Sequence, residues 1–264
     1  MKHLIPFMKT EPLVNVIRLQ GAISNSGQGL DDPSLAAVIE KAFRRGKPVA
    51  VGLQINCPGG SPVQSSLIAA RIRRLSEEKE VPVFAFVEDV AASGGYWLAC
   101  AADEIYADAS SLVGSIGVIS AGFGMQDLIA NYGVERRVHT AGTSKSMLDP
   151  FQKEKPADVK RLKGWLDQLH ENFIAHVKAR RGAKLSDNKA LYTGEVWIGA
   201  HAVVEGLIDG VDHLVPFMKA RFGDKVRLRR YGPRRSLFQR LGASITAATV
   251  AGIEDRAAFA RFGL

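Results

Sequence analysis

Residues 48–87 read PVAVGLQINCPGGSPVQSSLIAARIRRLSEEKEVPVFAFV. The apolar run at 48–55 is typical of a buried strand, and so is the run at 81–87. Between them, residues 62–79 place apolar side chains on one helical face and mostly charged side chains on the other. A strand, a helix and a strand in this order predict a right-handed parallel crossover, which is the repeating unit of an α/β fold.

The same alternation continues on both sides of this unit. On the N-terminal side we expect a strand at 13–19 and then a helix that begins after Asp31 and ends near Gly46. Strands separated by single helices predict an α/β domain that extends to about residue 215. On the C-terminal side the expected elements are a short helix at 92–102, strands at 104–107 and 135–139, a long amphipathic helix at 156–181 and a last α/β piece at 195–215.

The composition is that of an ordinary globular chain, with 264 residues, 46% of them hydrophobic and 23% charged. The net charge of +8 is concentrated in residues 219–240, which hold nine basic side chains and one acidic side chain. Because the rest of the chain has no net charge, we expect no nucleic-acid partner. The expected organisation is a lead at 1–12, a domain at 13–217 and a basic, Ala-rich C-terminal extension at 218–264.

Several classes of protein are excluded by the residues at hand. Cys57 and Cys100 are too few for a disulfide framework and match no zinc motif, and the sequence leaves open whether they pair. We expect no metal and no cofactor, because no His/Cys cluster and no complete nucleotide-binding motif is present. No apolar run reaches the roughly 18 residues of a membrane span, and the N-terminal run is too short for a signal peptide. We therefore expect a cytoplasmic protein, with peripheral contact to the inner membrane left open.

Three short stretches carry residues that can do chemistry. Ser93 follows a predicted strand and precedes Gly94 and Gly95, so its hydroxyl is open to a carbonyl and the next amide can point at an oxyanion. The NCPGG loop at 56–60 can expose backbone amides to a ligand. Lys145 lies in a Ser/Thr-rich loop, and a lysine is a base only when burial lowers its pKa from about 10.4. Taken singly, the three have ordinary interpretations as a helix cap, a turn and a solvated lysine.

Taken together, these stretches resemble the signal peptide peptidase A (SppA-type) family of serine peptidases. Five matching strings occur in the family's order, within about residues 13 to 215. They are NCPGG at 56–60, ASGGYW at 92–97, GSIGV at 114–118, the lysine-containing stretch at 142–151 and GEVWIGAHAVVEGLID at 194–209. The resemblance implies a ClpP/crotonase-like fold, which is a superhelix of β-β-α units in a single domain.

The resemblance also implies a role for individual residues. Ser93 matches the nucleophile and Lys145 the general base of a Ser–Lys dyad. The backbone amides of Gly60 and Gly94 match the oxyanion hole, and Ser115 matches the residue whose hydroxyl orients the lysine amine. The implied reaction is hydrolysis of peptides, either remnant signal peptides or unfolded segments, through an acyl-enzyme. The family further implies a homo-oligomer with active sites near subunit contacts.

Two other functions stay open from the sequence alone. A crotonase-type acyl-CoA enzyme shares the fold but usually relies on acidic catalysts. A non-catalytic membrane-surface scaffold would use the basic residues of 219–240 and the segment after residue 236 to contact anionic lipid. The same extension also fits a solvated terminus or a subunit contact, so membrane contact through residues 219–264 is one hypothesis among these.

Overall fold

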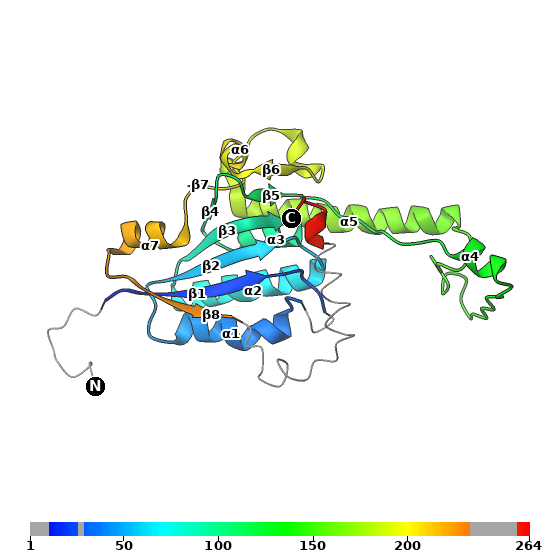
Figure 1. Cartoon of the computed structure of the whole chain (residues 1–264), viewed down its shortest axis with the longest axis horizontal. Coiled ribbons are helices and arrows are strands. Elements are labelled where there is room, and N and C mark those ends of the chain that lie inside the picture. Colours follow the sequence, from blue (N-terminus) through cyan, green and yellow to red (C-terminus); the bar gives the residue numbers. More distant parts are fainter. Residues whose placement is uncertain (1–10, 26–28, 233–257) are drawn as a thin grey trace.

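The computed structural model describes residues 11–25, 29–232 and 258–264, which form an α/β body with a projecting arm (Figure 1). Its eight-stranded sheet has the order β6-β5-β3-β2-β1-β8, with β4 between β3 and β7. Neighbouring strands run parallel, except for the antiparallel pair β5 and β6. The strands are β1 (Leu13–Gln20), β2 (Ala50–Cys57), β3 (Val83–Ala92), β4 (Glu104–Ala107), β5 (Leu112–Gly114), β6 (Val196–Ile198), β7 (Gly210–Val211) and β8 (Arg227–Tyr231).

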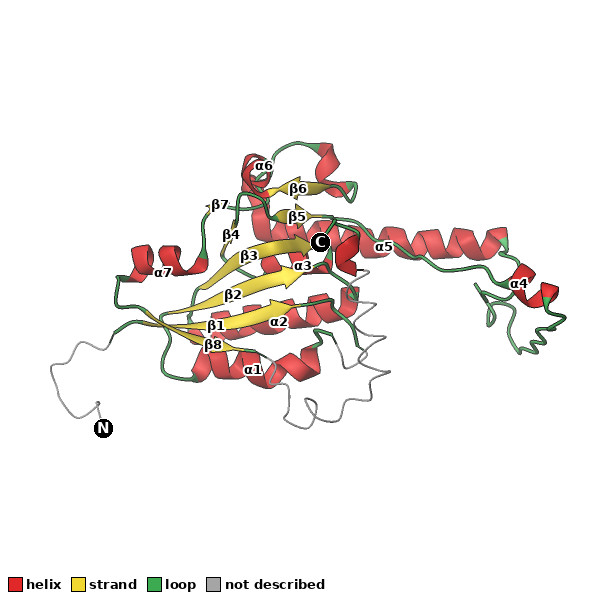
Figure 2. Ribbon diagram, viewed as in Figure 1, coloured by secondary structure: helices red, strands yellow, loops and turns green. Residues whose placement is uncertain are grey.

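Helices cover both faces of the sheet, and Figure 2 shows them against the strands. The larger core lies between the strands and the helices α1, α2, α3 and the C-terminal part of α5, and a smaller core lies under α7. Alternate side chains of one strand enter the two cores, as a pleated strand requires. The helices are α1 (Asp32–Arg44), α2 (Pro62–Lys79), α3 (Gly94–Ala99), α4 (Gln126–Asn131), α5 (Pro156–Arg181), α6 (Gly199–Val204) and α7 (Leu214–Phe222), with 3-10 turns at Gly182–Lys184 and Lys189–Tyr192.

Local sequence signals explain where the crossover helices begin. The side chain of Asp31 caps α1 by accepting from the amide of Ser34 at 2.8 Å, with Pro33 in the first turn. At the start of α2, Ser61 is likewise the capping residue and Pro62 lies in the first turn. The predicted α/β class is confirmed, and the helices at 62–79 and 156–181 and the strand at 104–107 have the predicted bounds.

Three expectations differ from the structure. The strand predicted at 135–139 is wrong, because this segment is irregular and exposed on the arm, where no neighbouring strand satisfies its backbone. The helix predicted at 92–102 is shorter, since β3 continues to Ala92. The chain also continues in the body beyond residue 217: Met218 is fully buried, and β8 pairs with β1. Most of the C-terminal extension after residue 236, including its possible lipid-contacting segment, lies outside the described residues.

The arm, residues 119–155, projects from the body beside the free end of α5 (Figure 1). The 26 residues of α5 span about 39 Å. Its buried side chains, Phe173, Val177 and Arg181, all lie in its C-terminal half, so the N-terminal half extends beyond the body. Among the described residues, no helix is both long enough and apolar enough to cross a bilayer.

Candidate active site

Ser93 lies between the carboxyl end of β3 and the first turn of α3. Its backbone has φ 52° and ψ −122°, and such sparsely populated conformations cost a residue about 1–3 kcal/mol and cluster at functional sites. The amide of Ser93 donates to the carbonyl of Gly114 at 2.8 Å, and its own carbonyl accepts from the amides of Tyr96 and Trp97. The surrounding structure therefore holds a strained turn in place, while Ser93 itself stays partly exposed.

The glycine loop after β2 packs directly on this turn. A β-carbon at Gly59 would lie 2.8 Å from Cβ of Ser93, and one at Gly94 would lie 3.4 Å from the amide nitrogen of Gly60. Gly60 has φ +138°, and a β-carbon there would lie 2.0 Å from the carbonyl oxygen of Ile23. Only glycine allows these close approaches, so the structure brings Ser93, Gly94 and the amide of Gly60 together.

Ser115 reaches the same place from β5. Ala92 at the end of β3 pairs with Gly114 at the end of β5. The residues that follow these two strands, Ser93 and Ser115, therefore lie at the same edge of the sheet. Ser115 also has a positive φ, 51°, and its amide donates to the carbonyl of Glu195 at 2.7 Å. Two strained non-glycine residues thus lie side by side at the carboxyl ends of adjacent parallel strands.

Lys145 lies elsewhere in the chain, on the arm. Its side chain is exposed, and its amide donates to the carbonyl of Gly142 in a local turn. Figure 1 shows α4 and the loops of the arm at the far end of α5, whereas α3 lies against the sheet. A single copy of the chain therefore brings together Ser93, Gly94, Gly60 and Ser115, but does not bring Lys145 to them.

The helix behind Ser93 is anchored by the string at 194–209. The hydroxyl of Tyr96, fully buried, donates to the carbonyl of Leu207 at 2.7 Å. Two residues further on, Asp209 accepts from the amide of Ile105 at 2.7 Å and from the buried guanidinium of Arg181 at 2.7 Å. This string therefore contributes to the floor of the site rather than to its surface.

Helix α5 is joined to the same short helix by aromatic contacts. Trp97 of α3 stacks on the ring of His176 at a centroid distance of 4.5 Å and on Phe173 at 5.0 Å. Nε2 of His176 also lies 3.2 Å from the carbonyl oxygen of Trp97. Burial lowers the pKa of His176 to about 4, so the ring is neutral near pH 7. The arm and the turn of Ser93 are thus connected through α5.

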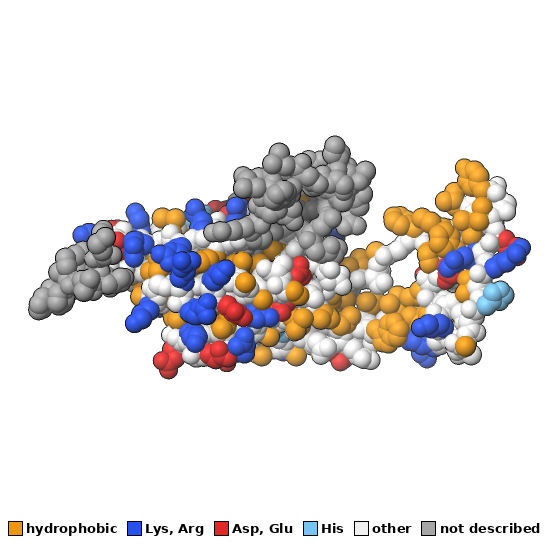
Figure 3. Space-filling view, turned by 90° about the horizontal axis from the view of Figure 1, so that it is seen from below, with side chains coloured by type: hydrophobic (Ala, Val, Ile, Leu, Met, Phe, Trp, Pro, Cys, Tyr) orange, Lys and Arg blue, Asp and Glu red, His pale blue; other side chains and the backbone are white. Residues whose placement is uncertain are grey.

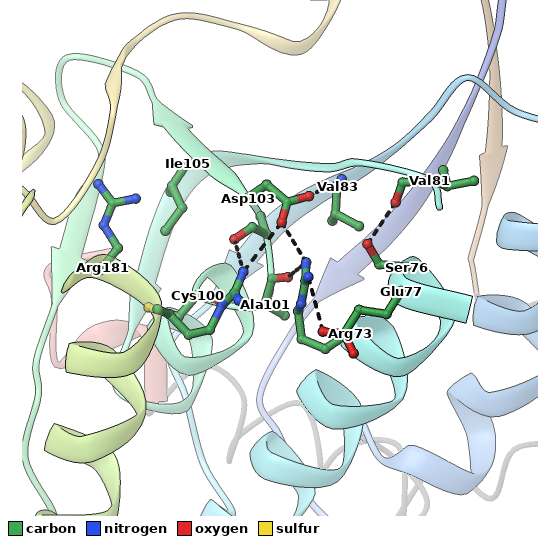
Figure 4. A network of polar contacts seen from close by, with 12 residues as sticks. Arg73, Ser76, Glu77, Val81, Val83, Cys100, Ala101, Asp103, Ile105 and Arg181 are labelled. Atoms are coloured by element: carbon green, nitrogen blue, oxygen red, sulfur yellow. Dashed lines mark hydrogen bonds and ion pairs between the residues drawn. The ribbon is translucent and has the colours of Figure 1, made fainter. Parts of the chain in front are cut away.

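Two arginines close the other end of α3, and sequence analysis did not identify them. Arg180 donates to the carbonyls of Cys100 and Ala102 at 2.8 and 2.9 Å, and Arg73 donates to the carbonyl of Ala101 at 3.2 Å. Both approach Asp103, whose other oxygen accepts from the backbone of β3 (Figure 4). These bonds satisfy carbonyls that a helix end leaves free, so they hold α3 against β3.

Other candidate chemistry is not supported in this part of the chain. Burial raises the pKa of the Cys100 thiol to about 12, so it carries no thiolate at neutral pH. Cys57 and Cys100 are both buried, and no disulfide joins them. The described residues contain no group of His, Cys, Asp or Glu side chains arranged to hold a metal ion.

Comparison with known proteins decides the family. The sequence model of peptidase family S49 matches residues 76–219, which include Ser93, Lys145 and the whole string at 194–209. The chain belongs to peptidase family S49. The S49 match starts near the end of α2 and ends within α7, so it covers the turn of Ser93, the arm and the anchoring string.

Relatives of this S49 chain carry different names. The chain is 46% identical, over its whole length, to the Na(+)/H(+) antiporter NhaA of Brucella melitensis, of which it spans 39%. It is 31% identical to the chloroplastic serine protease SPPA of Arabidopsis thaliana, with 76% of this chain and 31% of that protein aligned. The chain therefore spans less than half the length of these two relatives.

A solved structure supports the S49 fold. It is a mutant of the 1510-N membrane-bound stomatin-specific protease in complex with a substrate peptide, with a TM-score of 0.53 and 14% identity. The alignment covers 90% of this chain and 99% of that one. At this level of identity the likeness concerns the fold alone, and it confirms the α/β fold class expected from the sequence.

A methyl group at Gly60 is expected to disrupt the S49 site. In Gly60→Ala the new β-carbon would collide with the backbone of Ile23 and force the glycine loop away from Ser93. Under the peptidase function proposed below, peptide cleavage measured as kcat/KM should fall at least about 100-fold, which is the loss expected when one oxyanion donor is removed. Gly164→Ala on α5 is the matched control, because nothing lies within 4 Å of the added carbon. Similar losses in both variants would contradict the role of the loop.

Removing the charge of Asp209 is expected to destabilise the S49 body. Although burial opposes it, hydrogen bonds from Arg181 and Lys184 hold the pKa of the Asp209 carboxyl below its ordinary value. Arg181 is only 3% exposed, so Asp209→Asn leaves a buried cation without its partner, at a cost of about 3–5 kcal/mol in unfolding free energy near pH 7. Urea unfolding measures this cost, with the exposed Asp187→Asn as control.

The difference in unfolding free energy between wild type and Asp209→Asn depends on pH with a definite sign. A carboxyl whose pKa is lowered by folding contributes its stability above its unfolded pKa of about 4 and loses it as the pH falls further. The gap between wild type and Asp209→Asn should therefore be constant from pH 7 to about 5 and should shrink below pH 4. A gap that grows on acidification would contradict the ion pair.

Proposed function

We propose that this chain is a serine endopeptidase that cleaves peptides or unfolded segments, with Ser93 as nucleophile. The observation that carries the proposal is the strained turn at Ser93, onto which the Gly59–Gly60 loop packs. A strained turn presents the hydroxyl at the carboxyl end of a parallel strand, and the close glycines leave room for a substrate backbone beside it. Membership in family S49 supports the same reaction.

The proposed oxyanion hole consists of the backbone amides of Gly60 and Gly94. Attack by Oγ of Ser93 on a substrate carbonyl moves negative charge onto the carbonyl oxygen. Amides fixed before the reaction stabilise that charge without reorganisation. The close approach of the two glycines supports this pairing, because a β-carbon at Gly94 would lie only 3.4 Å from the amide nitrogen of Gly60.

We propose Lys145 as the general base and infer that it comes from a second copy of the chain. In one copy the arm keeps Lys145 exposed and away from Ser93. Serine needs a base within hydrogen-bond reach, and a lysine amine becomes a base when it is desolvated. Packing of one arm over the Ser93 turn of a neighbour would supply both conditions, and Ser115 would orient the amine there.

The surface of the arm supports such an assembly. No residue of the arm, 119–155, is buried, although several of its side chains are large and apolar. Contiguous exposed apolar surface of this kind marks interaction sites. We therefore propose a homo-oligomer in which arms pack on neighbouring copies. The most exposed of these side chains are Ile119 (68%), Phe123 (84%), Leu128 (53%), Tyr132 (78%) and Val134 (57%).

The proposed cycle uses only groups of the chain and water. Oγ of Ser93 attacks the carbonyl carbon while its proton passes to the amine of Lys145. The protonated amine then gives a proton to the leaving nitrogen as the peptide bond breaks, which leaves an acyl-enzyme. Lys145 next removes a proton from water, the hydroxide attacks the ester, and Ser93 is released with its proton.

The activity test combines hydrolysis with active-site labelling. A reduced, carboxymethylated protein serves as the unfolded substrate, and a fluorophosphonate probe reports an activated serine. We expect cleavage of the unfolded substrate and covalent labelling of Ser93, identified by peptide mass. Absence of labelling and of cleavage from a purified oligomer would contradict the proposal. No observation at the described site favours the acyl-CoA alternative.

A further inference from the structure

Much of the surplus positive charge lies on the folded body. Six of the nine basic residues between positions 219 and 240 belong to α7, to β8 or to the turn between them. Among the described strands, β8 lies at the edge of the sheet and pairs only with β1. The charge is therefore attached to a rigid element. These six residues are Lys219, Arg221, Lys225, Arg227, Arg229 and Arg230.

The C-terminal end of α1 adds more basic side chains beside β8. The guanidinium nitrogen Nη1 of Arg229 would lie 3.3 Å from a β-carbon at Gly46, so this side chain reaches across to the turn that follows α1. The space-filling view from below shows Lys and Arg gathered at this end of the body (Figure 3). We call the following set the basic edge, and each member is exposed: Lys41, Arg44, Arg45, Lys47, Arg227 and Arg229.

The charges of the basic edge are largely uncompensated. Arg227 approaches Glu11 at 3.5 Å, and no other member makes an ion pair with a described residue. The nearest acid on α1, Glu40, is instead paired with Arg71 of α2 at 3.4 Å. In the turn before β8, Asp224 and Lys225 are adjacent in the sequence, so their formal charges cancel. The edge therefore presents about five unneutralised cations to solvent.

Ordinary structural reasons account for only part of this charge. Basic residues in the last turn of α1 complement the helix dipole, which explains Lys41 and Arg44. Charged side chains on an edge strand discourage pairing with other chains, which explains Arg227 and Arg229. Neither reason requires a further two basic residues in the turn at 45–47. Their concentration at one end of the body points to an anionic partner.

We propose that the basic edge docks this chain on a membrane surface that contains anionic phospholipid. The cations lie at the amino-terminal end of the parallel strands, where α1 ends and β8 begins, so they can meet a surface together. Val49, 41% exposed, lies within the edge and offers an apolar contact between headgroups. A single-stranded nucleic acid would instead favour aromatic side chains among the cations. In the part of the chain that the structure describes, the most exposed aromatic residues, Phe123 and Tyr132, lie on the arm.

Vesicle co-sedimentation of the full chain tests this proposal. The probes are vesicles of phosphatidylcholine alone and of phosphatidylcholine with about 30% phosphatidylglycerol at low salt. Wild type should bind only the anionic vesicles, and binding should weaken as salt is added. Each Lys or Arg near an anionic surface contributes about fivefold to partition, so the R44Q/R45Q/K47Q/R229Q variant should bind at least about 100-fold more weakly.

Two variants separate the basic edge from charge in general. K153Q/K155Q/K160Q/K163Q removes the same charge from exposed positions of the arm and α5 and should bind like wild type. R234Q/R235Q/R240Q removes charge outside the described residues and should cost less than the edge variant. The proposal would be overturned if the R44Q/R45Q/K47Q/R229Q and K153Q/K155Q/K160Q/K163Q variants lost vesicle binding equally. It would also be overturned if only R234Q/R235Q/R240Q lost vesicle binding. Binding to a short DNA duplex but not to anionic vesicles would overturn it as well.

Discussion

Ser93→Ala is expected to abolish peptide hydrolysis, lowering kcat at least about 1,000-fold while substrate binding persists. The reason is chemical: alanine has no atom that can attack the carbonyl, so no acyl-enzyme forms. The oxyanion amides of Gly60 and Gly94 remain, so a small residual acceleration over water is compatible with the mechanism. The measurement is steady-state hydrolysis of the unfolded substrate, together with loss of fluorophosphonate labelling.

The controls for this substitution address folding. Ser66→Ala, at an exposed position of α2, makes the same chemical change away from the site and should retain activity and labelling. The thermal midpoint of Ser93→Ala should stay close to that of wild type, because the bonds that hold the turn are made by its backbone. Full activity in Ser93→Ala would eliminate Ser93 as the nucleophile, whatever the behaviour of the controls.

Lys145→Ala and Ser93→Ala should each be inactive alone and should recover activity when mixed. If the base comes from a neighbouring copy, a mixed oligomer contains sites that combine an intact Ser93 with an intact Lys145. Random mixing at equal amounts gives about one quarter of wild-type activity. The copy that supplies Ser93 has an intact Ser93 in half of the sites, and the neighbour that supplies Lys145 has an intact Lys145 in half of them. Mixing requires subunit exchange, so the chains should be co-refolded or co-expressed with different tags.

The outcome of mixing discriminates between two arrangements of the dyad. No recovery in verified mixed oligomers would show that one copy supplies both residues, after a movement of the arm. Activity of Lys145→Ala alone would remove the lysine from the mechanism altogether. Lys153→Ala, an exposed lysine of the same arm, serves as the matched control and should be fully active.

The elements near Ser93 could be predicted from local sequence. The signals for these elements, the capping residues Asp31 and Ser61 and the apolar alternation, are local, so they predict the strands and the crossover helices. The glycines at 59–60 were identified as a possible ligand loop from composition alone. Their actual constraint is steric contact with Ser93 and with Ile23, which depends on how the strands are ordered in the sheet.

Features that depend on distant partners could not be predicted in this way. The bonds from Arg180 to the end of α3 join residues about 80 positions apart, and nothing near Arg180 distinguishes it from a solvated arginine. The segment at 135–139 has strand-like composition, but the arm gives it no neighbour. Conversely, β8 resembles a basic tail in its sequence, although pairing with β1 makes it part of the sheet.

The parallel arrangement of the strands determines how far Ser93 lies from the basic edge. Ser93 follows the carboxyl end of β3, which has ten residues, whereas the basic edge lies at the amino-terminal ends of the strands. At about 3.3 Å per residue, the two are separated by about 30 Å along the strand direction. With its basic edge on a bilayer, the proposed enzyme would not reach peptide bonds that lie within the lipid. It would cut segments that extend at least about nine residues into the water, so the length of a protruding tail would decide which proteins are trimmed.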